Sequence, residues 1–255
     1  MHTRSTAFRL FVTVWIVFSI HFASDVVRES YLAITLGESF SIRVDEYMGL
    51  HPDLFRIEGR GAYINSNPGA SMMGAIPYAL ARPVIDGVLS LKPELAEPKP
   101  PSEYDDPRPN RNRFMNEARE RGLDIKLALA AASMQVGLMA PAGALAAVIM
   151  FIFLRGRLRS EETALALALL YAFGTPVFFR SAFLNQNLLL AHLILGAYVA
   201  LTGFRAPRPD GPLGPRPIAL AGLLLGLGVL HDYSAVSMLA VFAAWIVYRQ
   251  WSAGG

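Results

Sequence analysis

The chain alternates between long apolar blocks and short basic loops, with one long polar segment near its start. Apolar runs of this composition predict membrane-spanning helices. About six are predicted, at residues 10–23, 127–154, 163–179, 188–204, 218–230 and 234–248. Between the first two lies the polar segment, residues 25–125, which is rich in Asp, Glu, Arg, Asn, Gly and Pro. Polar residues kept beside a membrane at that density are typical of a ligand site or a reaction site.

The pattern predicts an all-α, polytopic helical membrane protein with a long outer loop that carries interfacial amphipathic helices. The predicted parts are a first transmembrane helix (1–24), an extracytoplasmic loop (25–125), a membrane bundle of about five helices (126–250) and a tail (251–255).

The first apolar run has a cleaved signal peptide as its alternative. That alternative is disfavoured because His21 or Phe22 would occupy the position that requires a small residue. Pro141 is expected to kink the second span, and Gly174-Thr-Pro176 is expected to break the third.

Composition supports the membrane class and excludes others. Apolar residues make up 53% of the chain and charged residues only 17%; a soluble domain of this length would be more charged. The net charge of +3 is too small to indicate a nucleic-acid partner, and no basic run is interleaved with aromatic residues. Cysteine is absent, which excludes a disulfide framework, a thiolate nucleophile and a Cys-based metal site.

Arginine placement predicts the orientation. With the N-terminus inside, the inner side holds nine arginines, whereas the outer short loops hold one, Arg180. The nine are Arg4, Arg9, Arg155, Arg157, Arg159, Arg205, Arg208, Arg216 and Arg249. The positive-inside rule therefore places the N-terminus in the cytoplasm and residues 25–125 outside, in a periplasm or a lumen. The same orientation brings Asn185-Gln-Asn187 and His231-Asp-Tyr233 to the outer face.

Within the polar segment, residues 25–37 carry Val27, Tyr31 and Ile34 at helical spacing, and Gly37 is a natural stop. This pattern predicts an amphipathic helix lying at the interface.

A second helix is predicted at 69–91 after a turn-rich stretch, with apolar residues on one side. Those residues are Met72, Met73, Ile76, Leu80, Val84 and Val88. Residues 92–113 are Pro-rich and charged and predict a mobile loop. Residues 114–121 are expected to lead helically into the second span.

Several polar residues of this segment are candidates for chemistry. Asp25, directly after a membrane helix, is either a general base with a raised pKa or the cap of the interfacial helix. Arg28 and Arg60 either bind a phosphate through bidentate hydrogen bonds or contact lipid headgroups. The pair Asp45-Glu46 is either a reactive carboxylate pair or two solvated loop acids.

Near the C-terminal end of the sequence, the pair His231-Asp232 has three interpretations: it binds a metal ion, donates a hydrogen bond to a phosphate, or caps a hairpin. A single His-Asp step favours the structural interpretation.

These residues, in this order, resemble the GT-C superfamily of polytopic glycosyltransferases that use polyprenyl-phosphate sugars. The closer likeness is to the bacterial branch related to aminoarabinose transferases, protein O-mannosyltransferases and Rgt-type lipopolysaccharide transferases. The residues that carry the resemblance are Asp25, Arg28, Tyr31, Tyr63, Asn67, Pro68, Gly69, Pro77 and the Gly174-Thr-Pro176 break. Val26 stands where the family has a second acid, and Glu29, one helical turn on, is its candidate replacement.

The resemblance implies sugar transfer from a polyprenyl-phosphate donor to a lipid, glycan or protein acceptor at the outer face of a bacterial inner membrane. It makes Asp25 the catalytic base. Donor-phosphate or substrate binding is assigned to Arg28, Glu29, Arg60, Tyr63, Asn67 and His231. Membrane lipid and the lipid-linked sugar are the implied partners. No cofactor is assigned, although a divalent metal ion remains an option. Family members usually have more spans, so we expect a fragment or truncated chain.

The alternative functions are a non-catalytic membrane subunit and a transporter component. A transporter would place ionisable residues inside its spans. Only His21 and His192 meet that condition in this sequence, which disfavours the transporter.

Overall fold

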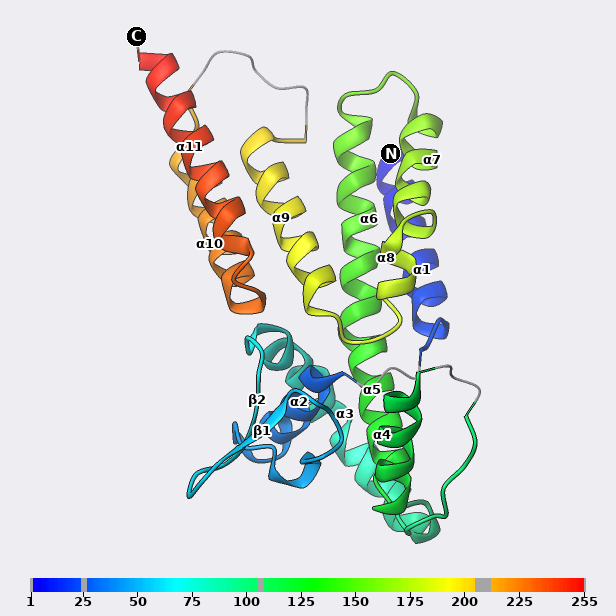
Figure 1. The fold of residues 1–255 in the computed structure, drawn as a ribbon. Coiled ribbons are helices and arrows are strands. Elements are labelled where there is room, and N and C mark those ends of the chain that lie inside the picture. Colours follow the sequence, from blue (N-terminus) through cyan, green and yellow to red (C-terminus); the bar gives the residue numbers. More distant parts are fainter. Residues whose placement is uncertain (1, 24–26, 105–107, 205–211, 255) are drawn as a thin grey trace. The chain divides into compact units, whose positions relative to one another are not determined.

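The computed structural model describes residues 2–23, 27–104, 108–204 and 212–254. These residues are mainly helical, and their strands form a two-stranded hairpin (Figure 1). The chain divides into two compact units. We call Met1–His21 with Met139–Gly255 the bundle unit, and Phe22–Leu138 the polar-segment unit.

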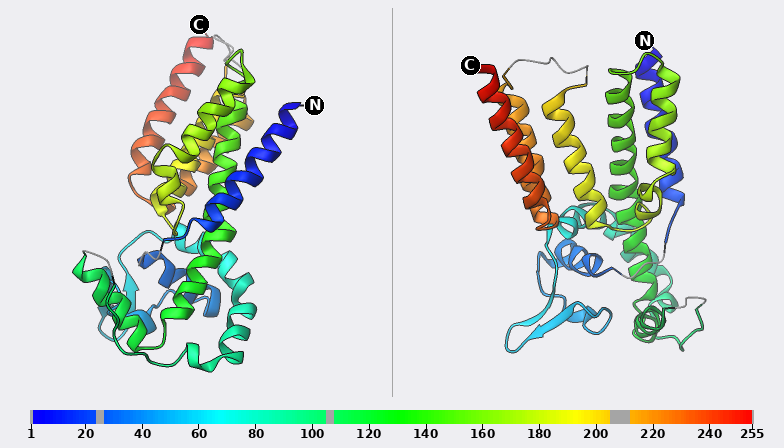
Figure 2. Two further views of the ribbon diagram at one scale, coloured as in Figure 1. Left: turned by 90° about the vertical axis from the view of Figure 1, so that its right-hand side faces the viewer. Right: turned by 45° about the horizontal axis from the view of Figure 1, so that its top comes forward.

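The bundle unit consists of helices packed side by side (Figures 1 and 2). They are α1 (His2–Ile20), α6 (Ala140–Arg155), α7 (Glu161–Phe173), α8 (Pro176–Arg180), α9 (Gln186–Thr202), α10 (Pro215–His231) and α11 (Ala235–Gly254). Helices α1, α7 and α9 pack on α6, and α10 packs on α9 and α11. Each of the six segments predicted to span a membrane therefore coincides with helical structure.

Close packing of α1 on α6 depends on Gly143. A Cβ atom at this position would lie 2.6 Å from Cε2 of Phe18, a ring that is fully buried. Phe18 also meets Phe173 edge-on, with 5.6 Å between the ring centroids. A glycine on α6 thus lets an aromatic ring of α1 fill the space between three helices.

One end of the bundle unit is held by polar contacts. The hydroxyls of Thr3 and Thr6 each donate to the Glu161 carboxylate over 3.0 Å, and Arg155 Nε lies 3.3 Å from the same carboxylate. These contacts join the start of α1 to the turn between α6 and α7. At the same turn, Arg157 donates to the carbonyl oxygen of Gly203 at 3.0 Å, at the end of α9.

The predicted helix break at Gly174-Thr-Pro176 is confirmed. Helix α7 ends at Phe173 and α8 begins at Pro176, where Thr175 caps α8 by accepting from the Val177 amide at 3.3 Å. Ahead of Pro141, residues Gln135–Met139 form a π-helical turn. Proline has no N–H and its ring clashes with the carbonyl four residues earlier, which favours such a local widening.

Two helical stretches are long and apolar enough to cross a membrane, Thr3–Ile20 and Asp124–Arg155. Helices α9 and α10 are apolar but shorter.

The polar-segment unit mixes helices with short irregular elements. They are α2 (Arg28–Ser39), a 3₁₀ turn at Asp45–Tyr47, β1 (Leu54–Ile57), β2 (Gly61–Ile64), α3 (Gly69–Leu91), a 3₁₀ turn at Pro93–Leu95, α4 (Pro109–Glu120) and α5 (Asp124–Met134). The hairpin is antiparallel, with Leu54 opposite Ile64 and Ile57 opposite Gly61.

Helix α2 differs from the predicted one-sided interfacial helix. Residues 29–35 are all buried, so α2 is the central helix of its unit. Gly37 does not end it: the helix continues to Ser39, and Phe40 at φ 53° is the C-cap. Gly37 instead allows contact with α3, since an added Cβ would lie 2.7 Å from Cδ1 of the buried Tyr78.

Helix α3 has the predicted bounds and a one-sided exposure of its apolar residues. Met72, Ile76, Leu80 and Val84 follow at intervals of four residues and are 51%, 64%, 78% and 69% exposed. The opposite side, including Tyr78, packs on α2 and α5.

The described part of the predicted mobile loop, residues 92–104 and 108–113, makes specific side-chain contacts and includes the start of α4. Asn116 accepts from the Ser102 amide at 2.8 Å and donates to its carbonyl at 3.1 Å. The Lys99 ammonium lies 2.9 Å from the Asp124 carboxylate. Helix α4 also ends before the second span, because Gly122 takes the left-handed φ of +68°. Side-chain bonds to α4 and α5 replace the regular backbone pairing that the Pro-rich sequence prevents.

Candidate functional site

Helix α2 begins with a charged cluster. Arg28 Nε lies 3.1 Å from the Glu29 carboxylate, and its Nη1 contacts the Asp53 carboxylate. Burial disfavours the charged guanidinium, but the two carboxylates outweigh this effect and raise the pKa of Arg28 above its usual value. The Glu29 side chain is only 8% exposed and is paired with this guanidinium.

Asp53 is the centre of this cluster. In addition to binding Arg28, it donates its amide to Nδ1 of His51 at 3.1 Å and accepts the Asn65 amide on its carbonyl oxygen at 2.9 Å. It thereby connects the start of α2 to the stretch that leads into α3. The His51 ring stacks on Phe114 of α4, with 6.2 Å between centroids.

The starts of α2 and α3 are joined directly. The hydroxyl of Ser71, fully buried in the first turn of α3, donates to the backbone carbonyl oxygen of Glu29 at 2.8 Å. Two stretches about forty residues apart, one carrying Arg28 and the other Asn67-Pro68-Gly69, are therefore neighbours.

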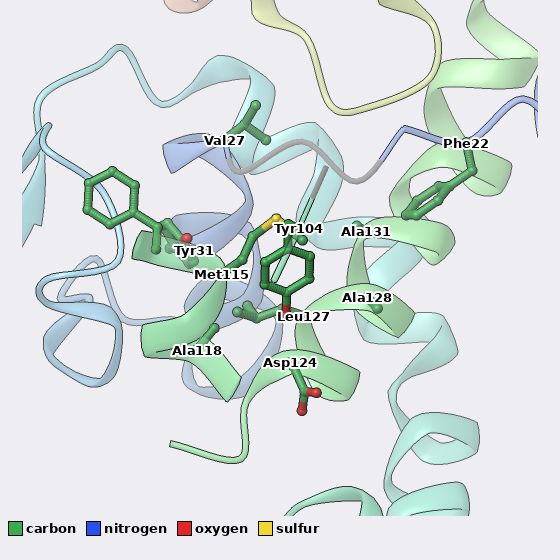
Figure 3. Close-up of a pocket in the computed structure, with 11 residues that line it drawn as sticks. Phe22, Val27, Tyr31, Tyr104, Met115, Ala118, Asp124, Leu127, Ala128 and Ala131 are labelled. Carbon is green, nitrogen blue, oxygen red and sulfur yellow. The ribbon is translucent and has the colours of Figure 1, made fainter. Parts of the chain in front are cut away.

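A pocket of about 160 Å³ lies beside the charged cluster, inside the polar-segment unit (Figure 3). Its walls come from the ends of α2, α4 and α5 and from two loops. They are formed by Phe22, Val27, Tyr31, Tyr104, Phe114, Met115, Ala118, Asp124, Leu127, Ala128 and Ala131. Most of this surface is apolar. The Tyr31 hydroxyl donates to the carbonyl of Leu50 at 3.3 Å, and burial raises its pKa, so it stays protonated.

The predicted base, Asp25, lies outside the described residues. Phe22 and Val27, which precede and follow the residues 24–26 outside the description, both line the pocket. Val27 holds the N-cap position of α2 without a side-chain cap bond.

The other predicted site residues are spread over several elements. Arg28 and Glu29 are in the cluster, and Asn67 is in the stretch that enters α3. Arg60 is exposed in the hairpin turn, where its carbonyl oxygen accepts from the Tyr63 hydroxyl at 3.0 Å. Among the described residues, no contact joins Arg60 to Arg28. His231 ends α10 in the bundle unit.

Two motifs that sequence analysis left open have structural contacts. Asp45 accepts the Ala62 amide at 2.8 Å, and Glu46 lies 3.4 Å from Lys126. Asp232 accepts the Ser234 amide at 2.7 Å, which caps the turn before α11, while the buried His231 ring contacts the Leu227 carbonyl at 2.9 Å.

Sequence reasoning missed His51, Asp53 and Ser71. His51 and Asp53 stand in a stretch without periodicity, and no spacing rule links Asp53 to Arg28. Ser71 lies in the predicted helix 69–91, but its periodicity does not show which carbonyl oxygen the hydroxyl would meet. A cluster of three or more metal-ligating side chains is not found among the described residues. Neither a protein-family model, nor a curated protein, nor a solved structure matches this chain.

Proposed function

We propose that this chain is part of a membrane glycosyltransferase of the GT-C type. It would transfer a sugar from a polyprenyl-phosphate donor to a lipid, glycan or protein acceptor at the outer membrane face. The observation that carries the proposal is the bond between Ser71 and Glu29, because it joins the two stretches on which the resemblance rests. A transferase site needs such a meeting of an acidic helix start with a second polar segment.

In this proposal Asp25 removes the proton from the acceptor hydroxyl. The acceptor oxygen forms a bond to the anomeric carbon as the bond from that carbon to the phosphate oxygen breaks, with inversion. The proton ends on Asp25, and the electron pair leaves with the polyprenyl phosphate.

Arg28 is the candidate partner of the leaving phosphate. Among the described residues, two of its five N–H groups meet carboxylates, and its side chain is 25% exposed. The remaining donors suit a phosphate oxygen. Glu29 and Asp53 would then hold the guanidinium in a fixed orientation, which is the role of a positioning carboxylate.

The membrane arrangement is part of the same proposal. The six predicted spans would cross a bacterial inner membrane, with the N-terminus in the cytoplasm. Supporting this orientation, Arg155 and Arg157 gather at the end of the bundle unit where α1 begins, joined through Glu161 and Gly203. The exposed apolar row on α3 is suited to lie against the outer leaflet.

The test uses the full chain in lipid nanodiscs and two measurements. Binding is measured by native mass spectrometry with undecaprenyl phosphate as the probe. This lipid is the product that remains after transfer from any of the possible sugar donors. Transfer is measured with a panel of radiolabelled undecaprenyl-phosphate hexoses and pentoses and a membrane lipid extract as acceptor. Asp25→Asn should keep binding and lose at least 100-fold in transfer, in the range of general-base catalysis (about 10² to 10⁴).

Arg28→Lys and Arg28→Gln should weaken undecaprenyl phosphate binding, more for glutamine than for lysine. Arg56→Gln, an exposed arginine of β1, is the matched control for charge. Asp86→Asn, which changes an exposed aspartate of α3, is the control for Asp25→Asn. Unchanged transfer in Asp25→Asn would remove Asp25 from the mechanism. Absence of both binding and transfer in the unaltered chain would favour a non-catalytic subunit.

A further inference from the structure

The pocket beside the charged cluster has a size and a chemistry of its own. Four aromatic rings, from Phe22, Tyr31, Tyr104 and Phe114, line it, and most of the remaining walls are aliphatic. Its volume of about 160 Å³ is close to that of an apolar cavity that holds one benzene molecule. It therefore has room for a group of about six carbon atoms.

Two of the polar groups at the edge of the pocket, those of Asp124 and Tyr31, already have partners. The Asp124 carboxylate lies 2.9 Å from the Lys99 ammonium and 3.9 Å from an Arg119 nitrogen. The Tyr31 hydroxyl is bonded to the carbonyl of Leu50. In Figure 3, Asp124 and Val27 lie at opposite ends of the group of side chains, with Tyr104, Met115 and Leu127 between them. A sugar would find few partners for its hydroxyls here, and a hydrocarbon group fits the lining better.

Several residues that line the pocket are close in sequence to the two candidate membrane spans. Phe22 follows two residues after the stretch Thr3–Ile20. Leu127, Ala128 and Ala131 lie in the first turns of Asp124–Arg155. Residues at the ends of both candidate spans thus also form walls of the pocket. If these helices cross a membrane, the hydrocarbon beside their ends is that of lipid chains.

We propose that the pocket binds a segment of about six carbons from the chain of a membrane lipid. The occupant is either one methyl-branched isoprenoid unit or a stretch of straight acyl chain, since both offer the same apolar surface. This binding does not depend on sugar transfer and would persist in a chain that transfers nothing.

The experiment is photochemical labelling of the full chain in nanodiscs with two diazirine probes of equal length. One is a geranyl phosphate analogue with the diazirine at the end of the branched chain, and the other is an octyl phosphate analogue. Cross-linked peptides are mapped by mass spectrometry. Both probes carry the same head, so any difference between them reports on the chain.

We expect saturable labelling within residues 114–131, with Ala128→Phe lowering it about tenfold. Ala128 is an exposed alanine in the wall, so a larger side chain fills the opening without entering the core. Ala79→Phe, at an exposed alanine of α3, is the matched control and should label like the unaltered chain. Ala131→Leu provides a second filling variant, and melting curves establish that each variant is folded.

Preference for the geranyl probe would identify an isoprenoid occupant, preference for the octyl probe an acyl chain, and equal labelling a general hydrocarbon site. Each of these results supports the proposal. Labelling that does not saturate, that maps elsewhere, or that survives both filling variants would overturn it. Loss of transfer in Asp25→Asn with labelling intact would separate this proposal from the catalytic one.

Discussion

The Ser71 hydroxyl donates a 2.8 Å hydrogen bond to the backbone carbonyl oxygen of Glu29, which fixes the first turn of α3 on the first turn of α2. Ser71 is fully buried. Ser71→Ala would remove this buried hydrogen bond and should lower the free energy of unfolding by about 0.5–1.5 kcal/mol.

Chemical denaturation of the detergent-solubilised chain, followed by circular dichroism, measures this loss. Ser90→Ala is the control, since Ser90 makes a similar bond to Gly87 at 2.9 Å on the exposed end of the same helix. Equal stabilities of the two variants would show that the bond does not hold the helices together.

Gly37 is predicted to be essential for the α2–α3 contact. In Gly37→Ala the new methyl group would meet the Tyr78 ring at 2.7 Å and the Ala75 carbonyl oxygen at 3.3 Å. Tyr78 is fully buried and has its hydroxyl bound to Glu38, so the ring has no room to yield. Overpacking should cost about 1–3 kcal/mol.

The control for Gly37→Ala is Gly87→Ala, which is expected to raise the stability instead of lowering it. Gly87, in α3, has no atoms within 4 Å of an added Cβ. Gly87→Ala should therefore stabilise the helix by about 0.5–1 kcal/mol, through helix propensity alone. A stabilising effect in both variants would refute the close contact at Gly37.

Gly122→Ala combines two effects. Its φ of +68° is strained for alanine, and the added Cβ would overlap the carbonyl oxygen of Ala96. Gly59→Ala, at φ +71° with nothing within 4 Å, carries only the backbone strain of about 1–2 kcal/mol. We expect Gly122→Ala to destabilise the chain clearly more than Gly59→Ala and to increase hydrogen exchange of residues 96–104. Similar exchange in the two variants would mean that the loop is not held at Gly122.

Glu161 predicts a pH dependence of the bundle unit. Hydrogen bonds from Thr6 and Thr3 lower the pKa of Glu161 below 4.5, and Arg155 adds to the effect. A lowered pKa in the folded state gives stability that is present above the unfolded-state pKa and is lost as the pH falls through the folded-state pKa.

The melting temperature of Glu161→Gln should therefore lie below that of the unaltered chain at neutral pH, and the difference should disappear below pH 4.5. Glu162→Gln changes the exposed neighbouring carboxylate and is the control. A difference that stays constant down to acid pH would contradict the role of this carboxylate.

Periodicity was sufficient to predict α3 but not the position of α2. The apolar residues of α3 repeat at helical spacing and start after Pro68-Gly69, so its bounds follow from local signals. Helix α2 contains Glu29, whose place in the sequence pattern is on the polar side, and it also contains Thr35. Both are buried: Glu29 pairs with Arg28, and the Thr35 hydroxyl donates to the carbonyl oxygen of Tyr31 at 3.2 Å.

The candidate site was predictable only where its residues are close in sequence. Arg28 and Glu29 follow from the helix start, whereas Asp53 reaches Arg28 across 25 residues of irregular chain. A Pro-rich composition predicted mobility for residues 92–113, yet in the described part the side chain of Asn116 makes two hydrogen bonds to the backbone of Ser102. Such bonds between distant residues leave no periodic trace in a sequence.

The two parts of the bundle unit are separated in the sequence by the polar-segment unit, so α1 is synthesised long before the helices on which it packs. Helix α1 ends at Ile20, and its partner α6 begins at Ala140, about 120 residues later. At about 5–20 residues per second, α1 leaves the ribosome roughly 6–24 s before α6 exists. For that interval the ring of Phe18 has no Gly143 to receive it. The face of α1 that carries Phe18 therefore stays without its α6 partner while the whole polar segment is made.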